Sequence, residues 1–187
     1  GIYALNSRLA ISRSLVFSNS AVFDGGGIYN SGGLNLTEVT VDSNAAGGDG
    51  GGIVNSGRLL IAGSVISRNV AGDNKGGGGA LFLSGADASA RISSTLIVSN
   101  RAVGSTGSGG GILQSGGVIS LTGVTVASNA ATGGAGGGIA NLDGVVLTLD
   151  RSTVYSNTAT DGGGISQMGG AIALINATGS GNRASNQ

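Results

Sequence analysis

Cysteine and histidine are both absent from this 187-residue sequence. Without cysteine the chain can form neither a disulfide bond nor a thiolate zinc site. Without histidine it lacks the commonest general base and metal ligand. Aromatic residues make up only 3% of the chain, whereas hydrophobic residues make up 40%, so we expect one domain whose core is filled with aliphatic side chains.

The sequence also has no net charge. Nine basic residues balance nine acidic ones, so the sequence carries no electrostatic footprint for nucleic acid or for an anionic membrane. No apolar run approaches the length of a membrane span, and no signal peptide is recognisable. We therefore expect no nucleic-acid partner and no membrane insertion. Because residue 1 already lies inside a repeat, we expect the chain to be a processed product or a fragment.

The sequence does contain 40 glycines and a repeat that occurs seven times, of which residues 25–46 are one copy. Each copy has a glycine cluster, then aliphatic residues, then an asparagine that is followed two residues later by alanine. Aliphatic residues stand ten, eight and three residues before the asparagine, with only Ala90 and Gly179 departing from this pattern. The asparagines are Asn19, Asn44, Asn69, Asn100, Asn129, Asn157 and Asn182.

The spacing of the aliphatic residues indicates short β-strands. Pairs such as Leu34 with Leu36 and Val39 with Val41 show the alternation of a strand. An α-helical repeat is disfavoured because each glycine costs a helix about 1 kcal/mol, and glycines interrupt every copy. A repeat of this length must stack on its neighbours to bury its apolar face. We therefore predict an all-β fold, a single-stranded parallel β-helix of about seven coils with three short strands in each.

The predicted β-helix occupies residues 1–187 as a single domain. Only two turns vary in length, the turn before the glycine cluster and the turn before the first aliphatic pair, which is typical of tolerant surface loops. Asp143 is expected on such an exposed turn. The predicted coils lie near residues 1–24, 25–49, 50–77, 78–108, 109–135, 136–161 and 162–187.

The fixed distance of each asparagine from the core aliphatic residues of its own repeat predicts a structural role. Stacked coils place equivalent residues about 4.8 Å apart, which turns each column of residues into a ladder along the axis. An asparagine amide can donate to the coil on one side and accept from the coil on the other. We therefore interpret the seven asparagines as a structural ladder rather than as a polar binding stripe, with the alanine suited to a tight corner.

Acidic residues supply the best candidates for a metal site. Asp24, Asp49 and Asp161 directly precede glycine clusters, and the first two fall in neighbouring coils. Two such carboxylates could share a calcium ion, which prefers several oxygen ligands. Lys75 falls near the same corner, however, and a solvated acid on a turn is the commoner case. Both alternatives stay open at this point.

Catalysis by a glycosidase or a lyase needs clustered carboxylates, or calcium with a basic residue placed to take a proton. Arg13 and Arg151 share a column but lie several coils apart. The pairs Asp150 with Arg151 and Glu38 with Asp42 are isolated and typical of exposed faces. We therefore predict no catalytic, cofactor-binding or metal-binding residue, no cofactor and no enzymatic activity.

Two motifs of the repeat carry a family resemblance. The tetrapeptide 78–81 (Gly-Gly-Ala-Leu) and the tetrapeptides 41–44 and 126–129 (Val-x-x-Asn) resemble the paired motifs of polymorphic outer-membrane proteins and related bacterial surface β-helices. The resemblance covers essentially the whole chain. It implies a right-handed parallel β-helix of the pectate-lyase-like superfamily, an extracellular or cell-surface location, and a structural or adhesive role. Because that superfamily also contains pectate lyases and polygalacturonases, the alternative is a carbohydrate-active β-helix whose catalytic part is degenerate or lies outside this segment.

The two ends of the chain suggest a partner. The first repeat already has Leu9 and Ile11 in core columns, and the last still offers Ile172 and Leu174. A further copy of the chain could continue the ladders at either end and form a filament. The other interpretation is a fragment cut at a repeat boundary. The expected partners are therefore a second copy, bound end to end, or a ligand on a host or cell surface.

Overall fold

The structure is a computed structural model that describes residues 1–72, 76–142 and 144–186. These residues form strands and turns only, with no helix among them, so none of them forms a helix able to cross a membrane. Lys75 and Asp143, for which the sequence predicts a place at the acidic corner and on an exposed turn, lie outside the described residues. The all-β prediction is confirmed.

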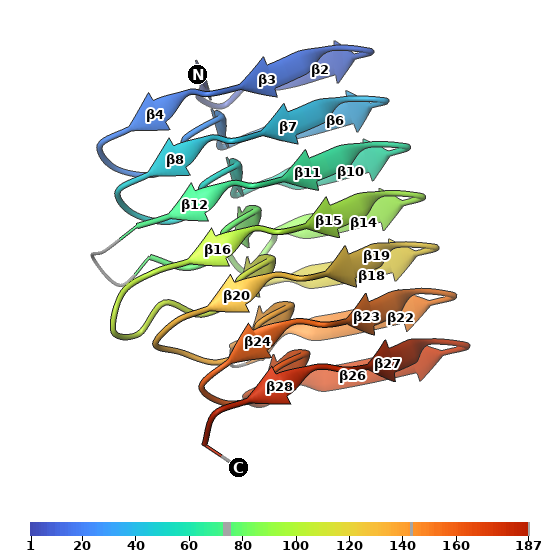
Figure 1. The fold of residues 1–187 in the computed structure, drawn as a ribbon. Coiled ribbons are helices and arrows are strands. Elements are labelled where there is room, and N and C mark those ends of the chain that lie inside the picture. The colour runs from blue at the N-terminus through green and yellow to red at the C-terminus, as the bar shows by residue number, and fades with distance from the viewer. Residues whose placement is uncertain (73–75, 143, 187) are drawn as a thin grey trace.

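The strands form four parallel sheets of seven strands each, stacked along one axis (Figure 1). Sheet 1 contains β1 (Ile2–Ala4), β5 (Ile28–Asn30), β9 (Ile53–Asn55), β13 (Leu81–Leu83), β17 (Ile112–Gln114), β21 (Ile139–Asn141) and β25 (Ile165–Gln167). Sheet 2 contains the longest strands, β2 (Arg8–Ser12), β6 (Gly33–Thr37), β10 (Arg58–Ala62), β14 (Ser89–Ser93), β18 (Val118–Thr122), β22 (Val146–Asp150) and β26 (Ala171–Ile175).

The other two sheets have shorter strands. Sheet 3 contains β3 (Leu15–Phe17), β7 (Thr40–Asp42), β11 (Val65–Ser67), β15 (Leu96–Val98), β19 (Thr125–Ala127), β23 (Thr153–Tyr155) and β27 (Thr178–Ser180). Sheet 4 contains β4 (Ser20–Ala21), β8 (Ala45–Ala46), β12 (Val70–Ala71), β16 (Arg101–Ala102), β20 (Ala130–Ala131), β24 (Thr158–Ala159) and β28 (Arg183–Ala184). Each coil therefore contributes one strand to each sheet in turn.

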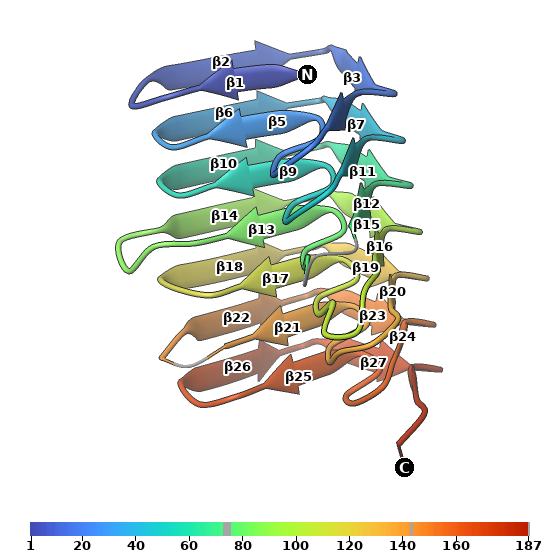
Figure 2. The ribbon, with the colours of Figure 1, turned by 90° about the vertical axis from the view of Figure 1, so that its left-hand side faces the viewer.

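The coils are right-handed. In Figure 2 the chain runs along sheet 1 in front, returns along sheet 2 behind it, and then comes forward through sheet 3 as it descends from the N-terminal to the C-terminal coil. Figure 1 shows the same sense from the side of sheets 3 and 4. The molecule is thus a right-handed parallel β-solenoid, and the strand order within each sheet gives it seven coils.

The prediction of three strands per coil is wrong, because the structure has four. The fourth strand comprises the two residues that end in the alanine of each repeat, such as Ala45 and Ala46, and this alanine was expected to form only a corner. Its backbone pairs with the coils beside it, as in the hydrogen bond from Ala45 N to Asn19 O at 2.9 Å. Two residues are too few to show an alternating pattern, so the sequence gives no signal for this strand.

The core is a stack of aliphatic columns, as the spacing predicts. Leu34 and Leu36 pair in register with Leu59 and Ile61 of the next coil, and all four are at most 1% exposed. Sheets 1 and 3 contribute their inward residues to the same core. Aliphatic residues from three sheets meet on the axis and fill the core without an aromatic side chain.

The glycine clusters allow the chain to fold back over the outer face of sheet 1. The first glycine of the cluster at Gly25 has φ +70°, a conformation that costs glycine little. A Cβ atom on Gly26 would collide with the carbonyl oxygen atoms of Ala45 and Gly51. Beneath such a turn, Val54 is only 3% exposed although it points outward from its strand. The glycines therefore permit a second, thinner apolar layer outside the main core.

Candidate functional site

The seven ladder asparagines stand above one another between sheets 3 and 4. In each step the Nδ2 atom of one asparagine donates to the Oδ1 atom of the next, at 2.9–3.0 Å. The same Oδ1 atom also accepts the backbone N–H of the preceding asparagine. A further Nδ2 bond returns to a carbonyl oxygen of an earlier coil, as from Asn129 to Ile97 O at 3.0 Å.

This geometry gives the ladder a structural role. The five interior asparagines are at most 1% exposed: Asn44, Asn69, Asn100, Asn129 and Asn157. Each of them uses both amide atoms in bonds between coils. Buried polar groups are stable only when they are hydrogen-bonded, and here the ladder satisfies itself. Its amides are therefore not available to a ligand from solvent.

A second column of amide side chains, which the sequence analysis missed, lies at the end of the sheet 1 strands. Each member is the third residue of its sheet 1 strand, and all of them share one register column: Asn30, Asn55, Gln114, Asn141 and Gln167. Ala4 and Leu83 occupy the same column in the first and fourth coils. In the sequence, each of these amides stands two positions after the aliphatic residue that follows a glycine cluster, and this spacing could have predicted the column. The mixture of asparagine and glutamine, and Leu83 in the fourth coil, obscured the pattern.

The second column satisfies itself less completely than the ladder. Asn30 Nδ2 donates to Asn55 Oδ1 at 2.8 Å, whereas Gln114 Nε2 turns to Gly117 O at 3.0 Å. Among the described residues, the side-chain oxygen atoms of Asn30, Gln114 and Asn141 are buried without a hydrogen-bond partner. Ala4 precedes Asn30 in the column, and Leu83 precedes Gln114. The oxygen atoms of Asn30 and Gln114 therefore lack a donor, because neither an alanine nor a leucine side chain can donate a hydrogen bond.

The acidic corner is built differently from a metal site. The structure brings Asp24 and Asp49 into neighbouring coils, where Asp24 Oδ1 accepts the backbone N–H of Asp49 at 2.8 Å and Asp49 Oδ1 accepts that of Gly77 at 2.7 Å. Asp161 lies at the same corner several coils away, where its backbone forms an isolated parallel β-bridge with Ala135. Within the described part of the chain, no group of three or more acidic side chains could hold a metal ion. Asp24 and Asp49 serve as acceptors for the backbone of the next coil.

The pKa of Asp49 is raised above its ordinary value, chiefly because partial burial disfavours the charged form and also because Asp24 carries a like charge nearby; the Gly77 N–H opposes this shift. An acid whose folded pKa is raised binds its proton more tightly in the folded state. Its contribution to stability therefore falls as the pH rises from its unfolded pKa through its folded pKa.

We expect Asp49→Asn to remove this pH dependence, because the amide keeps an oxygen for the Gly77 N–H and carries no charge. Urea unfolding at pH 7 and pH 4.5 measures the effect. Between pH 7 and pH 4.5 the change in the free energy of unfolding should be more favourable for the original chain than for the variant. The other acids are the same in both proteins, so the difference between the two changes reports on Asp49. An equal pH response in both proteins would contradict the assignment of the shift to Asp49.

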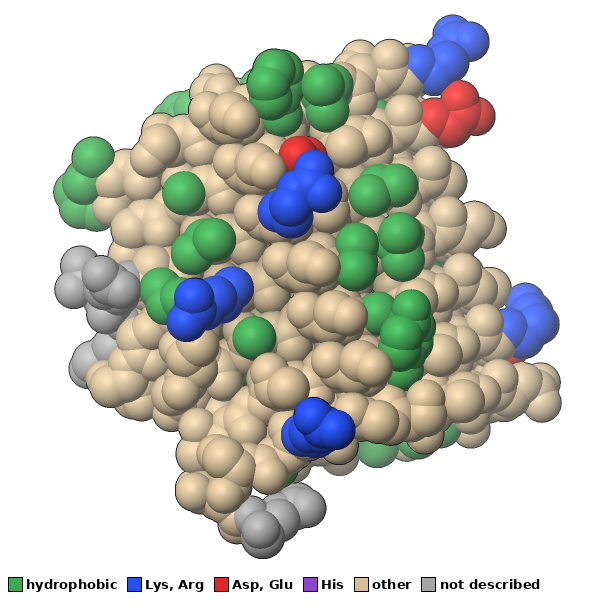
Figure 3. Space-filling view, viewed as in Figure 1, with side chains coloured by type: hydrophobic (Ala, Val, Ile, Leu, Met, Phe, Trp, Pro, Cys, Tyr) green, Lys and Arg blue, Asp and Glu red, His purple; other side chains and the backbone are tan. Residues whose placement is uncertain are grey.

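The remaining charged candidates do not converge. Asp150 and Arg151 form an exposed ion pair at 2.8 Å. Asp42 pairs with Arg68 at 2.7 Å and accepts from Ser67 at 2.6 Å. Partial burial raises the pKa of Asp42, but the hydrogen bonds from Ser67, Arg68 and Ser43 outweigh it and leave the pKa below its ordinary value. Figure 3 shows the face of sheets 3 and 4, where basic groups are scattered singly.

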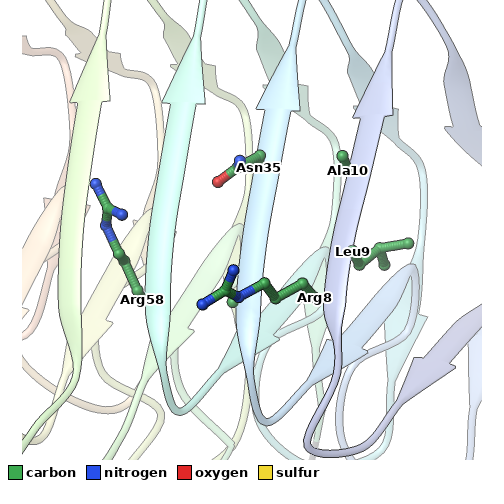
Figure 4. A pocket seen from close by; sticks show the side chains of 6 residues that line it. Arg8, Leu9, Ala10, Asn35 and Arg58 are labelled. Carbon is green, nitrogen blue, oxygen red and sulfur yellow. The ribbon is translucent and has the colours of Figure 1, made fainter.

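Three hollows lie along the outer face of sheet 2. A hollow of about 390 Å³ lies over the first three coils, lined by Arg8, Leu9, Ala10, Gly33, Asn35 and Arg58 (Figure 4). Two further hollows continue it along the axis. They share Arg91 and Ser93 with each other, and the nearer one shares Asn35 with the first hollow.

Comparison of the chain with protein-family models, with curated proteins and with solved structures found no significant match. What the structure establishes is therefore the parallel β-solenoid. The likeness of its motifs to bacterial surface repeats stays a proposal.

Proposed function

We propose that this chain is a non-catalytic structural and adhesive β-helix of an extracellular or cell-surface protein. The observation that supports this proposal most directly is the continuous asparagine ladder, which ties all seven coils together through buried amide bonds. Seven coils at about 4.8 Å each make a rod roughly 34 Å long. Such a rod holds a ligand or a neighbouring domain at a fixed distance from its anchor.

The resemblance of the repeat motifs to polymorphic outer-membrane proteins, within the pectate-lyase-like superfamily, supports the surface location. The alternative is a carbohydrate-active β-helix whose catalytic part is degenerate or outside this segment. Its carboxylates would need to converge on a substrate, whereas Asp24 and Asp49 each accept a backbone N–H of the next coil. Release of reducing or unsaturated ends from polygalacturonate by a clean preparation would replace the structural proposal with this alternative.

The proposal includes end-to-end association of copies. Ile172 and Leu174 of β26 are 40% and 58% exposed, although Leu147 and Leu149, their register partners in β22, are buried. Asn182 accepts from Asn157 and donates to Val154 O. The backbone N–H that every earlier asparagine donates to the next one therefore faces the open end of the solenoid. The first coil of a second copy would offer an asparagine acceptor and aliphatic columns in the same cross-section.

We expect the chain to form filaments at high concentration, and Leu174→Lys to abolish them by placing a charge in the stacked core. Negative-stain electron microscopy and light scattering measure the outcome. Leu96→Lys is the matched control, because Leu96 is 37% exposed on the outer face of sheet 3 and should leave filaments intact. A chain that stays monomeric at high concentration, or filaments that survive Leu174→Lys unchanged, would rule out end-to-end stacking.

A further inference from the structure

Three arginines line the hollows on the outer face of sheet 2. Arg8 and Arg58 occupy one register column, two coils apart. Arg91 lies in the coil after Arg58, two residues further along its strand, where it pairs with Leu60. At about 4.8 Å per coil the three span roughly 14 Å along the axis. All three are exposed. In the described structure, the arginines that form ion pairs are Arg68 and Arg151, on other parts of the surface.

The strands of this face carry no opposing charge over five coils, and the nearest acids, Glu38 and Asp87, lie in the turns at its two edges. Strands β2, β6, β10, β14 and β18 contain no acidic residue. Asp150 follows only in the sixth coil and is paired with Arg151. The chain is neutral overall, so this face concentrates positive charge that the whole-chain balance conceals. A surface of this kind attracts an anion that lies along the solenoid axis.

A gap between Arg8 and Arg58 makes room for a ligand group. Gly33 separates the two arginines in their register column, and a Cβ atom added there would meet only Arg8 Cγ, at 3.6 Å. Figure 4 shows Arg8 extending across β6, the amide of Asn35 lying over the same strand, and Arg58 extending away from both toward β14. Two guanidinium groups and one amide thus line the first hollow.

We infer that this trough binds a linear sulfated polysaccharide along the solenoid axis. A guanidinium group forms paired hydrogen bonds with two oxygen atoms of one anionic group. A sulfate ester presents three such oxygen atoms, whereas a carboxylate presents two. Further along the trough, Ser93, Ser120 and Thr122 offer hydroxyl groups for sugar hydroxyls.

Nucleic acid fits the trough less well. Proteins that bind single strands stack the bases on aromatic side chains, and none of the three hollows is lined by an aromatic residue. The inference rests on the adhesive part of the proposed function, for which it names the class of ligand. It does not depend on stacking of copies, because every residue of the trough belongs to the side wall of one copy.

Binding to immobilised heparin tests the inference. The experiment uses the Leu174→Lys background, so that filament formation and ligand binding are scored separately. The variant Arg8→Ser/Arg58→Ser/Arg91→Ser should bind heparin at least about tenfold more weakly than the parent, and the parent's affinity should fall steeply as salt increases. The control Arg68→Ser/Arg101→Ser/Arg183→Ser removes the same charge outside the trough and should bind within about twofold of the parent.

Gly33→Glu provides a second variant that leaves every arginine in place. Its carboxylate would pair with Arg8 and Arg58 and fill the gap, so heparin binding should be lost while the thermal unfolding midpoint stays near that of the parent. Three results would overturn the inference: a parent that does not bind heparin, a trough variant that binds as tightly as the control, or equal binding of polygalacturonate or of a single-stranded oligonucleotide. The last result would mean that the trough does not select sulfated sugars.

Discussion

Replacing Asn129 with alanine should lower the free energy of unfolding by about 1–3 kcal/mol, beyond the effect of an ordinary surface substitution. The side chain donates to Asn157 Oδ1 and to Ile97 O, both at 3.0 Å. Its Oδ1 atom accepts the backbone N–H and the Nδ2 of Asn100, at 2.9 and 3.0 Å. Truncation leaves the buried backbone N–H of Asn100 without its acceptor, at a cost of about 1–3 kcal/mol, whereas Asn100 Nδ2 keeps Ile66 O and Val98 O.

Urea unfolding followed by circular dichroism measures this loss. Asn35→Ala is the matched control, because Asn35 is exposed on the outer face of sheet 2 and its truncation should cost less than about 0.5 kcal/mol. If both variants unfold at the same urea concentration as the parent, the ladder does not contribute to stability and the structural role of its asparagines is wrong.

Leu121→Ala should cost about 2–5 kcal/mol, the range for truncation of a buried leucine. Leu121 is completely buried and stacks in register between Ile92 and Leu149. The coils on either side are held at a fixed spacing by their own backbone hydrogen bonds, so the cavity cannot collapse easily. The full cost of the void is therefore expected.

Val118→Ala on the same strand separates the cavity from a general effect of strand mutation. Val118 belongs to β18 but points outward and is 50% exposed, so this substitution should cost less than about 1 kcal/mol. Equal losses from the two variants would show that Leu121 is not a core residue. A loss confined to Leu121→Ala would support the inward column that the repeat spacing predicts.

The local pattern of the chain was enough to predict the main core and the solenoid. Residues such as Leu34 and Leu36 alternate within five positions, and the asparagines recur at a fixed distance from them. Side chains of a strand alternate between its faces whatever the rest of the chain does. A repeat that keeps this pattern can bury its apolar side only by stacking. The inward columns therefore followed from sequence spacing alone.

Elements without a periodic pattern could not be predicted in this way. The two-residue strands of sheet 4 are too short to alternate, and Leu83 interrupts the second amide column. The spacing of Asp24 and Asp49 also could not predict that each carboxylate accepts a backbone N–H of the next coil. These features depend on which group of one coil faces which group of the next.

The sequence by itself determined the all-β class, the stacking of about seven coils and the inward aliphatic and asparagine columns, because these follow from spacing within one repeat. Only the tertiary structure decided which outward residues become neighbours. Arg58 and Arg91 are separated by an insertion in the fourth coil, yet the register Arg58–Ser89 places them on adjacent strands. The inward columns keep this register, as in the pairs Leu59–Ala90 and Ile61–Ile92, and the insertion bulges out without shifting the strands that it connects. The sulfate-binding trough thus arises from alignment between coils, which no single repeat encodes.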